Sequence, residues 1–110
     1  MSVNLTLAFD RYGFRGPILC SERHRLAWQN YEAFDRIKAE AMPLPDGVQW
    51  YEDEGLKEWK EDPYGEPLTF MSAHSIARHL SAAPLRGFDS ATLAYLKALP
   101  SETRVVLWWS

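Results

Sequence analysis

The most constraining feature of this chain is the segment just before its C-terminal serine. Thr103 to Trp109 is rich in β-branched and aromatic residues, which are enriched in β-strands. Within it the run from Val105 to Trp109 is apolar without interruption. A continuous apolar run of this kind is typical of a central strand that is buried on both faces. The chain therefore predicts a sheet with its C-terminal strand near the middle.

The N-terminal segment also reads as a strand. Val3, Leu5, Leu7 and Phe9 share one parity, while more polar or smaller residues occupy the other. This period of two predicts a half-buried strand. We expect the two terminal strands to pair as neighbours in the centre of the sheet.

Three helices are expected. The first covers about 22–41, because Ser21 and Glu22 suit a helix start and apolar residues recur at spacings of three to five until Pro43. Ser72 is expected to cap a second helix through about Ser81. Asp89 or Ser90 is expected to cap a third helix through about Leu99, which Pro100 closes.

The middle of the chain predicts further strands. Residues 48–51 look like a short strand that Gly55 ends. Residues 56–60 and 68–71 flank a segment with Pro63 and Gly65, which suits a tight turn. We interpret these two flanks as the arms of a β-hairpin.

Together these elements predict an α+β fold. The 110 residues are 46% hydrophobic and 25% charged, which is ordinary for a single globular domain. The expected architecture is one domain over residues 1–110. It has a mostly antiparallel sheet of about four to five strands, with two to three helices packed on it.

Composition indicates the cellular compartment of the protein and the partners that it does not bind. The single cysteine, Cys20, permits no internal disulfide, which fits a reducing cytoplasm. No apolar run approaches the roughly 20 residues that span a bilayer, and the N-terminus lacks the apolar core of a signal peptide. We therefore expect a cytoplasmic protein without membrane contact. The net charge of −3 argues against nucleic-acid binding by the chain as a whole, because nucleic-acid binders are usually basic.

Motifs for catalysis or cofactors are weak. His74 and His79 are five residues apart rather than four, and His24 lies between two arginines, so no metal site is expected. There is no phosphate-binding glycine loop and no nucleophile elbow, and no cofactor is expected. Cys20 near His24 leaves open a small enzyme with a thiol nucleophile, and His74 is a further candidate base.

The segment from Asp46 to Glu66 stands out for its charge. It holds eight acids against two bases, a local charge of −6, together with four large aromatic residues. One interpretation is a charged hairpin whose acids keep an edge strand from pairing with other chains. The other is a negative surface that binds a basic partner. The candidate contact residues are Trp50, Tyr51, Glu52, Asp53, Glu54, Trp59 and Tyr64.

A basic cluster offers a second candidate surface. Four arginines lie within fifteen residues, with Tyr12 and Phe14 between the first of them. They are Arg11, Arg15, Arg23 and Arg25. Such a cluster can contact phosphate or an acidic partner, and it can equally be a solvated face paired with nearby acids.

Two stretches carry a resemblance. Glu61 to Phe70, followed by Ala73 to Leu80, is similar to small uncharacterised proteins of tailed bacteriophages and prophages. The C-terminal stretch of 98–100 and 103–109 resembles the same group. The resemblance covers about the C-terminal half. It implies an accessory protein that binds a bacterial host protein, including components of bacterial defence, and it implies no catalytic residue.

These observations favour a small non-enzymatic protein that binds and modulates a bacterial host protein. An anti-defence inhibitor of the anti-CRISPR type is one concrete form. The alternatives are a nucleic-acid-binding regulator that uses the arginine cluster, and an enzyme centred on Cys20 and His24. A homodimer is a further expectation, because exposed aromatic residues and an edge strand can also serve self-association.

Overall fold

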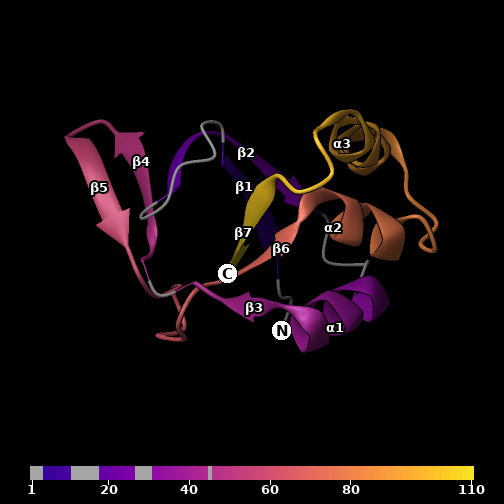
Figure 1. Cartoon of the computed structure of the whole chain (residues 1–110), viewed down its shortest axis with the longest axis horizontal. Helices are drawn as coiled ribbons and strands as arrows, with labels where there is room; N and C mark the ends of the chain where they lie inside the picture. The colour runs from indigo at the N-terminus through magenta and orange to yellow at the C-terminus, as the bar shows by residue number, and fades with distance from the viewer. Residues whose placement is uncertain (1–3, 11–17, 27–30, 45) are drawn as a thin grey trace.

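A computed structural model describes residues 4–10, 18–26, 31–44 and 46–110 of the chain. Strands and helices gather into one body, with the helices on one side of the sheet (Figure 1). The elements, in chain order, are β1 Leu5–Asp10, β2 Ile18–Leu26, α1 Tyr31–Glu40, β3 Met42–Pro43, β4 Val48–Glu52, β5 Gly55–Trp59, β6 Thr69–Ser72, α2 Ala73–Leu80, α3 Gly87–Ala98 and β7 Arg104–Trp109.

The strands form one mixed sheet. In the described part of the chain its seven strands lie in the order β3-β6-β7-β1-β2-β4-β5. All neighbours are antiparallel except β2 and β4, which are parallel. The expectation of about four to five strands is therefore wrong. It missed β2, which pairs with β1 and β4, and the two-residue β3, which pairs with β6.

The centre of the sheet is the pair of terminal strands. β1 and β7 run antiparallel, with Leu5 opposite Trp109 and Phe9 opposite Val105. Leu107 packs in the core on the helix side, whereas Val106 packs on the other side. The predictions that the terminal strands pair and that the C-terminal strand is buried on both faces are confirmed.

The first helix is shorter than expected. α1 begins at Tyr31 rather than near residue 22, and residues 18–26 form β2 instead. The predicted helix start at Ser21 lies inside that strand. β2 pairs with β1 from Leu26 opposite Leu5 to Cys20 opposite Asp10, with one irregularity. Backbone pairing with a central strand thus outweighs the local helix signal.

The other two helices agree better with the sequence. The Ser72 hydroxyl accepts a hydrogen bond from the backbone N–H of Ser75 at 3.2 Å, so Ser72 caps α2 as predicted. α3 starts at Gly87, before the expected cap at Asp89 or Ser90, and its N-cap residue Arg86 makes no side-chain capping hydrogen bond. Its Leu96 is fully buried, while Leu93 and Leu99 pack against the same core.

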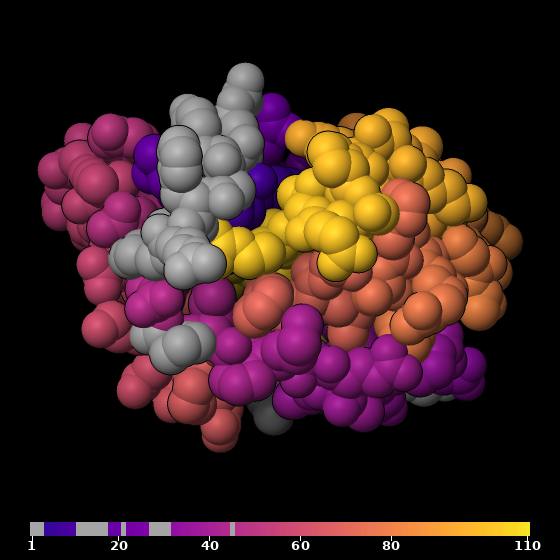
Figure 2. Space-filling model, in the orientation of Figure 1, coloured from indigo at the N-terminus to yellow at the C-terminus, as the bar shows by residue number. Residues whose placement is uncertain are grey.

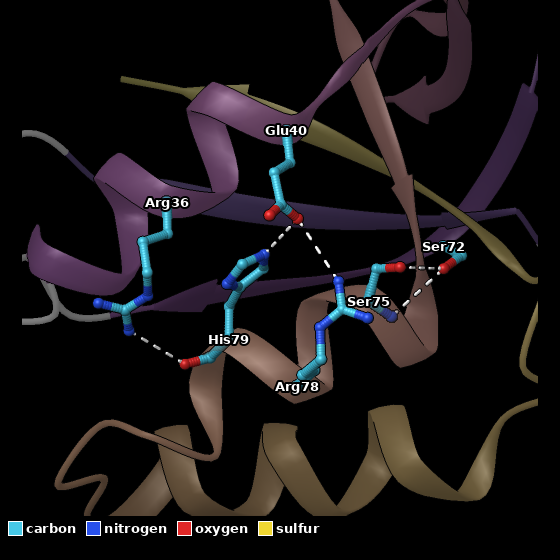
Figure 3. A network of polar contacts seen from close by, with 6 residues as sticks. All are labelled: Arg36, Glu40, Ser72, Ser75, Arg78 and His79. Carbon is cyan, nitrogen blue, oxygen red and sulfur yellow. Dashed lines mark hydrogen bonds and ion pairs between the residues drawn. The ribbon is translucent and has the colours of Figure 1, made fainter.

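A polar network joins α1 to α2. Nε2 of His79 donates to Oε2 of Glu40 at 2.7 Å, and the Arg78 guanidinium lies 3.5 Å from the same oxygen (Figure 3). Arg36 of α1 donates to the backbone carbonyl of His79 at 3.3 Å. Glu40 and Arg78 are exposed, but the His79 side chain is about nine-tenths buried. The network therefore fixes the two helices at the rim of the core.

The sheet curls around a second apolar cluster on the face away from the helices. This cluster includes Ile18, Val48, Trp50, Leu68 and Val106. The chain just after β5 reaches the chain just before β6, because the N–H of Leu68 donates to the carbonyl of Lys60 at 3.0 Å. The curl gives the chain a core on both faces of its sheet.

The predicted hairpin of residues 56–60 and 68–71 is wrong. β5 pairs with β4, and β6 pairs with β7 and β3. The expected arms meet at their ends, through the bridge between Glu61 and Pro67 and the hydrogen bond from the N–H of Leu68 to the carbonyl of Lys60. The tight turn itself is present, because Oδ1 of Asp62 accepts from the N–H groups of Tyr64 and Glu66 at 2.9 and 3.1 Å.

Candidate functional site

The strands β4 and β5 form a hairpin at one end of the sheet. Asp53 and Glu54 are its two-residue tip, because Glu52 pairs directly with Gly55. In Figure 1 the hairpin lies at the left, away from the three helices, and in Figure 2 its atoms form that end of the molecule. Four of the seven acidic and aromatic residues selected from the sequence, Tyr51 to Glu54, lie at this tip.

The base of the hairpin is held by aromatic packing. The ring of Trp50 lies 4.9 Å from that of Trp108 on β7, and Trp59 lies 5.5 Å from Trp108, both edge-on. The Arg23 guanidinium lies 4.8 Å above the Trp50 ring, a cation–π contact. Trp50 is only 4% exposed and Trp59 is partly buried. These two indoles therefore anchor the hairpin rather than present a surface.

Polar contacts extend from the packed base of the hairpin to its tip. The indole N–H of Trp50 donates to Oε1 of Glu52 at 3.0 Å. Nζ of Lys57 lies 3.4 Å from a carboxylate oxygen of Glu52 and 3.4 Å from one of Glu54. The hydrogen bond from Trp50, followed by Lys57 and Arg23, lowers the pKa of Glu52, although partial burial opposes the shift. The Glu52 carboxylate therefore stays ionised at neutral pH, and these contacts hold it in place.

The outer surface of the hairpin is apolar as well as acidic. Tyr51 and Leu56 stand directly opposite each other, and they are 68% and 49% exposed. Asp53 and Glu54 are exposed beside them. A hollow of about 630 Å³ lies at the tip, lined by Arg23, Tyr51, Glu52, Asp53, Glu54 and Lys57. An exposed aromatic–aliphatic pair beside acids is a suitable contact surface for a basic protein.

Sequence reasoning missed Leu56 as a surface residue. The signal was present, because Leu56 and Glu58 share a parity opposite to that of Lys57 and Trp59. It was hidden by the assumption that residues 56–60 pair with 68–71. Once β5 is paired with β4, the side of Leu56 is the side of Tyr51.

Tyr64 lies apart from this surface. It is in the turn beyond the far end of β5, and it is 51% exposed. There it lines a different hollow, of about 580 Å³, together with Lys38 and Trp109. The structure thus separates Tyr64 from the other six candidate residues.

The basic cluster is only partly described. Arg11 and Arg15 lie outside the described residues. Arg23 and Arg25 are exposed on β2, opposite Ala8 and Thr6 of β1. Arg23 lines the acidic hollow, so its charge is directed partly toward the carboxylates of the hairpin.

Cys20 and His24 do not form a catalytic pair. Cys20 packs in the cluster away from the helices, whereas His24 lies on the helix side, 3.3 Å from the Thr92 hydroxyl and 4.9 Å from the Tyr95 ring. Burial first, and then the charge of Asp10, raise the pKa of the Cys20 thiol to about 12, against a smaller opposing effect of Arg23. His74 is exposed on α2. Neither of the two predicted bases therefore lies beside the thiol, and its raised pKa disfavours the ionised form that a nucleophile needs.

Across the described ranges, no group of three or more His, Cys, Asp or Glu residues is placed to hold a metal ion. No helix in the same ranges is long and apolar enough to cross a bilayer.

Comparisons with protein-family models, with curated proteins and with solved structures found no match to this chain. We therefore infer the function from the hairpin itself and from the chemistry of its surface.

Proposed function

We propose that this protein is a non-enzymatic binding protein that engages another protein through the β4–β5 hairpin. In the phage setting that the sequence resemblance implies, the partner is a bacterial host protein. The observation that carries the proposal is the exposed Tyr51–Leu56 pair, which lies beside a cluster of carboxylates on an anchored hairpin.

Preorganisation supports this function. A surface that is already fixed loses little conformational entropy when it binds, so more of the contact energy appears as affinity. Trp50 is clamped by Trp108 and Arg23, and it holds Glu52 through its indole N–H. Lys57 then ties Glu52 to Glu54.

Electrostatics supports a basic partner. Residues 52–58 carry four acids and one base, a local charge of −3. The base, Lys57, is already engaged by two of these acids. Complementary charge mainly speeds association and excludes wrong partners, while Tyr51 and Leu56 supply the apolar area that slows dissociation.

The test is quantitative capture from a bacterial lysate treated with nuclease, using a tagged wild-type protein and two variants. Asp53→Lys with Glu54→Lys reverses two charges at the tip and leaves Glu52 in its structural role. Asp35→Lys with Glu102→Lys makes the same charge change on exposed residues elsewhere. We expect a stoichiometric partner that the tip variant loses at least tenfold and the control variant retains.

Tyr51→Ala and Tyr64→Ala test the apolar part in the same assay. Both tyrosines are exposed, at 68% and 51%, but only Tyr51 belongs to the hairpin. We expect Tyr51→Ala to lose the partner and Tyr64→Ala to retain it. Equal capture by the wild type and by both hairpin variants would exclude this surface.

A separate measurement tests the alternative that the protein binds nucleic acid. Phosphate binding through Arg23 and Arg25 depends steeply on salt. Retention on DNA or RNA at low salt that is lost with Arg25→Ala would favour it. We expect no such retention, because acids surround Arg23.

A further inference from the structure

We infer that the outer edge of β5 binds an extended, basic segment of the partner protein by adding a strand to the sheet. This inference rests on the proposed function and specifies how the hairpin makes its contact. Strand addition uses main-chain hydrogen bonds for affinity and alternate side chains for specificity.

β5 lies at one edge of the sheet. It is the last strand in the order of the sheet, and its one strand neighbour within the described ranges is β4. In Figure 1 its far side faces away from the rest of the molecule. An edge strand presents a row of N–H and C=O groups that can pair with another chain.

The hydrogen bonds of β4 determine which backbone groups of β5 face outward. The N–H of Ile18 donates to the carbonyl of Gly47 at 3.2 Å, so the odd-numbered residues of β4 direct their backbone groups toward β2. The even-numbered residues of β4 then face β5, where their partners are Gly55, Lys57 and Trp59. In an antiparallel ladder the intervening residues point the other way. Leu56 and Glu58 therefore present their backbone N–H and C=O groups at the free edge.

The side chains along this edge are exposed, and most of the charged ones are acidic. Leu56 is 49% exposed, and Glu58 on the same face is exposed beside it. Glu58 lies 3.9 Å from Lys60, a loose pair between exposed groups. At one end of the edge lies the hollow of the tip with three carboxylates. Because Leu56 and Glu58 share a face, an incoming strand with lysine or arginine side chains on that face meets Glu58 and the acids of the tip. The aliphatic stem of one such side chain covers Leu56.

A second copy of this chain fits the edge poorly. A two-fold axis that pairs β5 with itself in antiparallel fashion sets residues of equal parity opposite each other. Centred on Lys57 or on Glu58, it places like charges face to face. Centred on Leu56, it places Glu58 opposite Glu54. Like charges directly opposite destabilise a strand pair, so charge favours a foreign basic segment.

The experiment separates backbone from side-chain binding. Glu58→Pro removes the outward N–H at a position that does not bond to β4, which an edge strand tolerates. Glu58→Ala removes the same carboxylate but keeps the N–H. Each variant is titrated with a fluorescent peptide of alternating lysine and valine, with a glutamate–valine peptide as the charge control, and with the captured partner.

We expect Glu58→Pro to weaken binding of the lysine peptide and of the partner at least tenfold, and Glu58→Ala to weaken it no more than threefold. The glutamate peptide should not bind. Hydrogen exchange on the wild type gives a second measurement that needs no variant. The amides of Leu56 and Glu58 should exchange at least tenfold more slowly in the complex.

The outcomes distinguish the inference from the function on which it rests. If Glu58→Pro binds the partner as tightly as Glu58→Ala and the two amides gain no protection, strand addition is excluded while hairpin binding stands. If the tip variant and Tyr51→Ala also leave capture unchanged, the proposed function fails as well. A dimer that Glu58→Pro dissociates would assign the edge to a second copy and overturn the basic segment.

Discussion

The indole N–H of Trp50 donates a 3.0 Å hydrogen bond to a carboxylate oxygen of Glu52, two residues away on the same strand. Trp50 is almost fully buried, whereas Glu52 is at the exposed end of the hairpin. Two residues apart on a strand, they share a face of the sheet. This contact links the packed interior to the acidic tip, so the position of the tip depends on the core.

The first prediction concerns this contact. Trp50→Phe removes the hydrogen bond and part of a packed ring, and the lost packing alone should lower the free energy of unfolding by about 1–2 kcal/mol. The pKa of Glu52 should rise, because the largest cause of its lowering is gone. Urea denaturation measures the first effect and carboxyl NMR titration measures the second.

Trp59→Phe is the matched control. The Trp59 indole nitrogen is buried and lacks a hydrogen-bond partner among the described residues. An unsatisfied buried donor costs about 1–3 kcal/mol, so its removal offsets the lost packing. Trp59→Phe should therefore change stability little, and a larger loss than with Trp50→Phe would contradict this account.

The second prediction concerns pH and the contact between α1 and α2. The hydrogen bond from His79, ahead of smaller effects of Arg78, lowers the pKa of Glu40 from 4.5, against a partial opposing effect of desolvation. The folded pKa is thus below the unfolded one. The stabilisation is fully present above about pH 4.5 and is lost as the pH falls through the folded pKa.

Glu40→Gln should make the free energy of unfolding less dependent on pH below 4.5, as measured by urea denaturation at several pH values. Glu32→Gln removes an acid from the first turn of the same helix and leaves the contact with His79 in place. Glu32→Gln should therefore keep the pH dependence of the free energy of unfolding that Glu40 contributes in the wild type. An unchanged pH dependence in Glu40→Gln would show that the contact does not contribute in solution.

The third prediction concerns Cys20. Because burial raises the pKa of its thiol to about 12, almost none is ionised at pH 7, and the side chain is only 3% exposed. An aromatic disulfide reagent should label the folded protein at least 100-fold more slowly than the protein unfolded in urea at the same pH. Labelling of the folded protein at the rate of an unhindered thiol would revive the enzyme hypothesis.

The fourth prediction concerns Gly47, which precedes β4. Its φ is +74°, and a Cβ there would lie 2.5 Å from the carbonyl oxygen of Trp59. Gly47→Ala should therefore lower the free energy of unfolding by about 2–4 kcal/mol, through backbone strain and the clash together.

Gly65→Ala separates the two causes, since Gly65 has a similar φ of +80° but open space around its Cβ position. Gly65→Ala should lower the free energy of unfolding by the backbone strain alone, about 1–2 kcal/mol. Thermal or urea denaturation of both variants measures the difference. Equal losses would show that the backbone beside Trp59 shifts to accommodate the new methyl group.

Part of the fold could be predicted because its signals are local. The alternation of Leu5, Leu7 and Phe9 and the apolar run from Val105 predicted two strands at the sheet centre, and the Ser72 cap predicted α2. Residues 22–26 were assigned to the first helix because Ser21 and Glu22 suit a helix start. Their strand is stabilised by β1, and that contact is not visible in the local pattern.

The candidate site was predicted in composition but not in arrangement. The acids and Tyr51 could be selected from charge and aromatic content. The burial of Trp50 could not, since it depends on Trp108, which lies more than fifty residues away in sequence. Leu56 was missed because its exposure follows from pairing with Tyr51 rather than from its own neighbours.

The sequence by itself determined the parity of the terminal strands, the cap of α2, the turn at residues 62–66 and the excess of acids between 46 and 66. These follow from interactions within a few residues. The tertiary structure alone decided that β5 lies at the edge, that two indoles anchor the hairpin and that Leu56 faces outward. Strand order and burial are set by contacts between distant segments, and such contacts form only when the whole chain packs around its two apolar clusters.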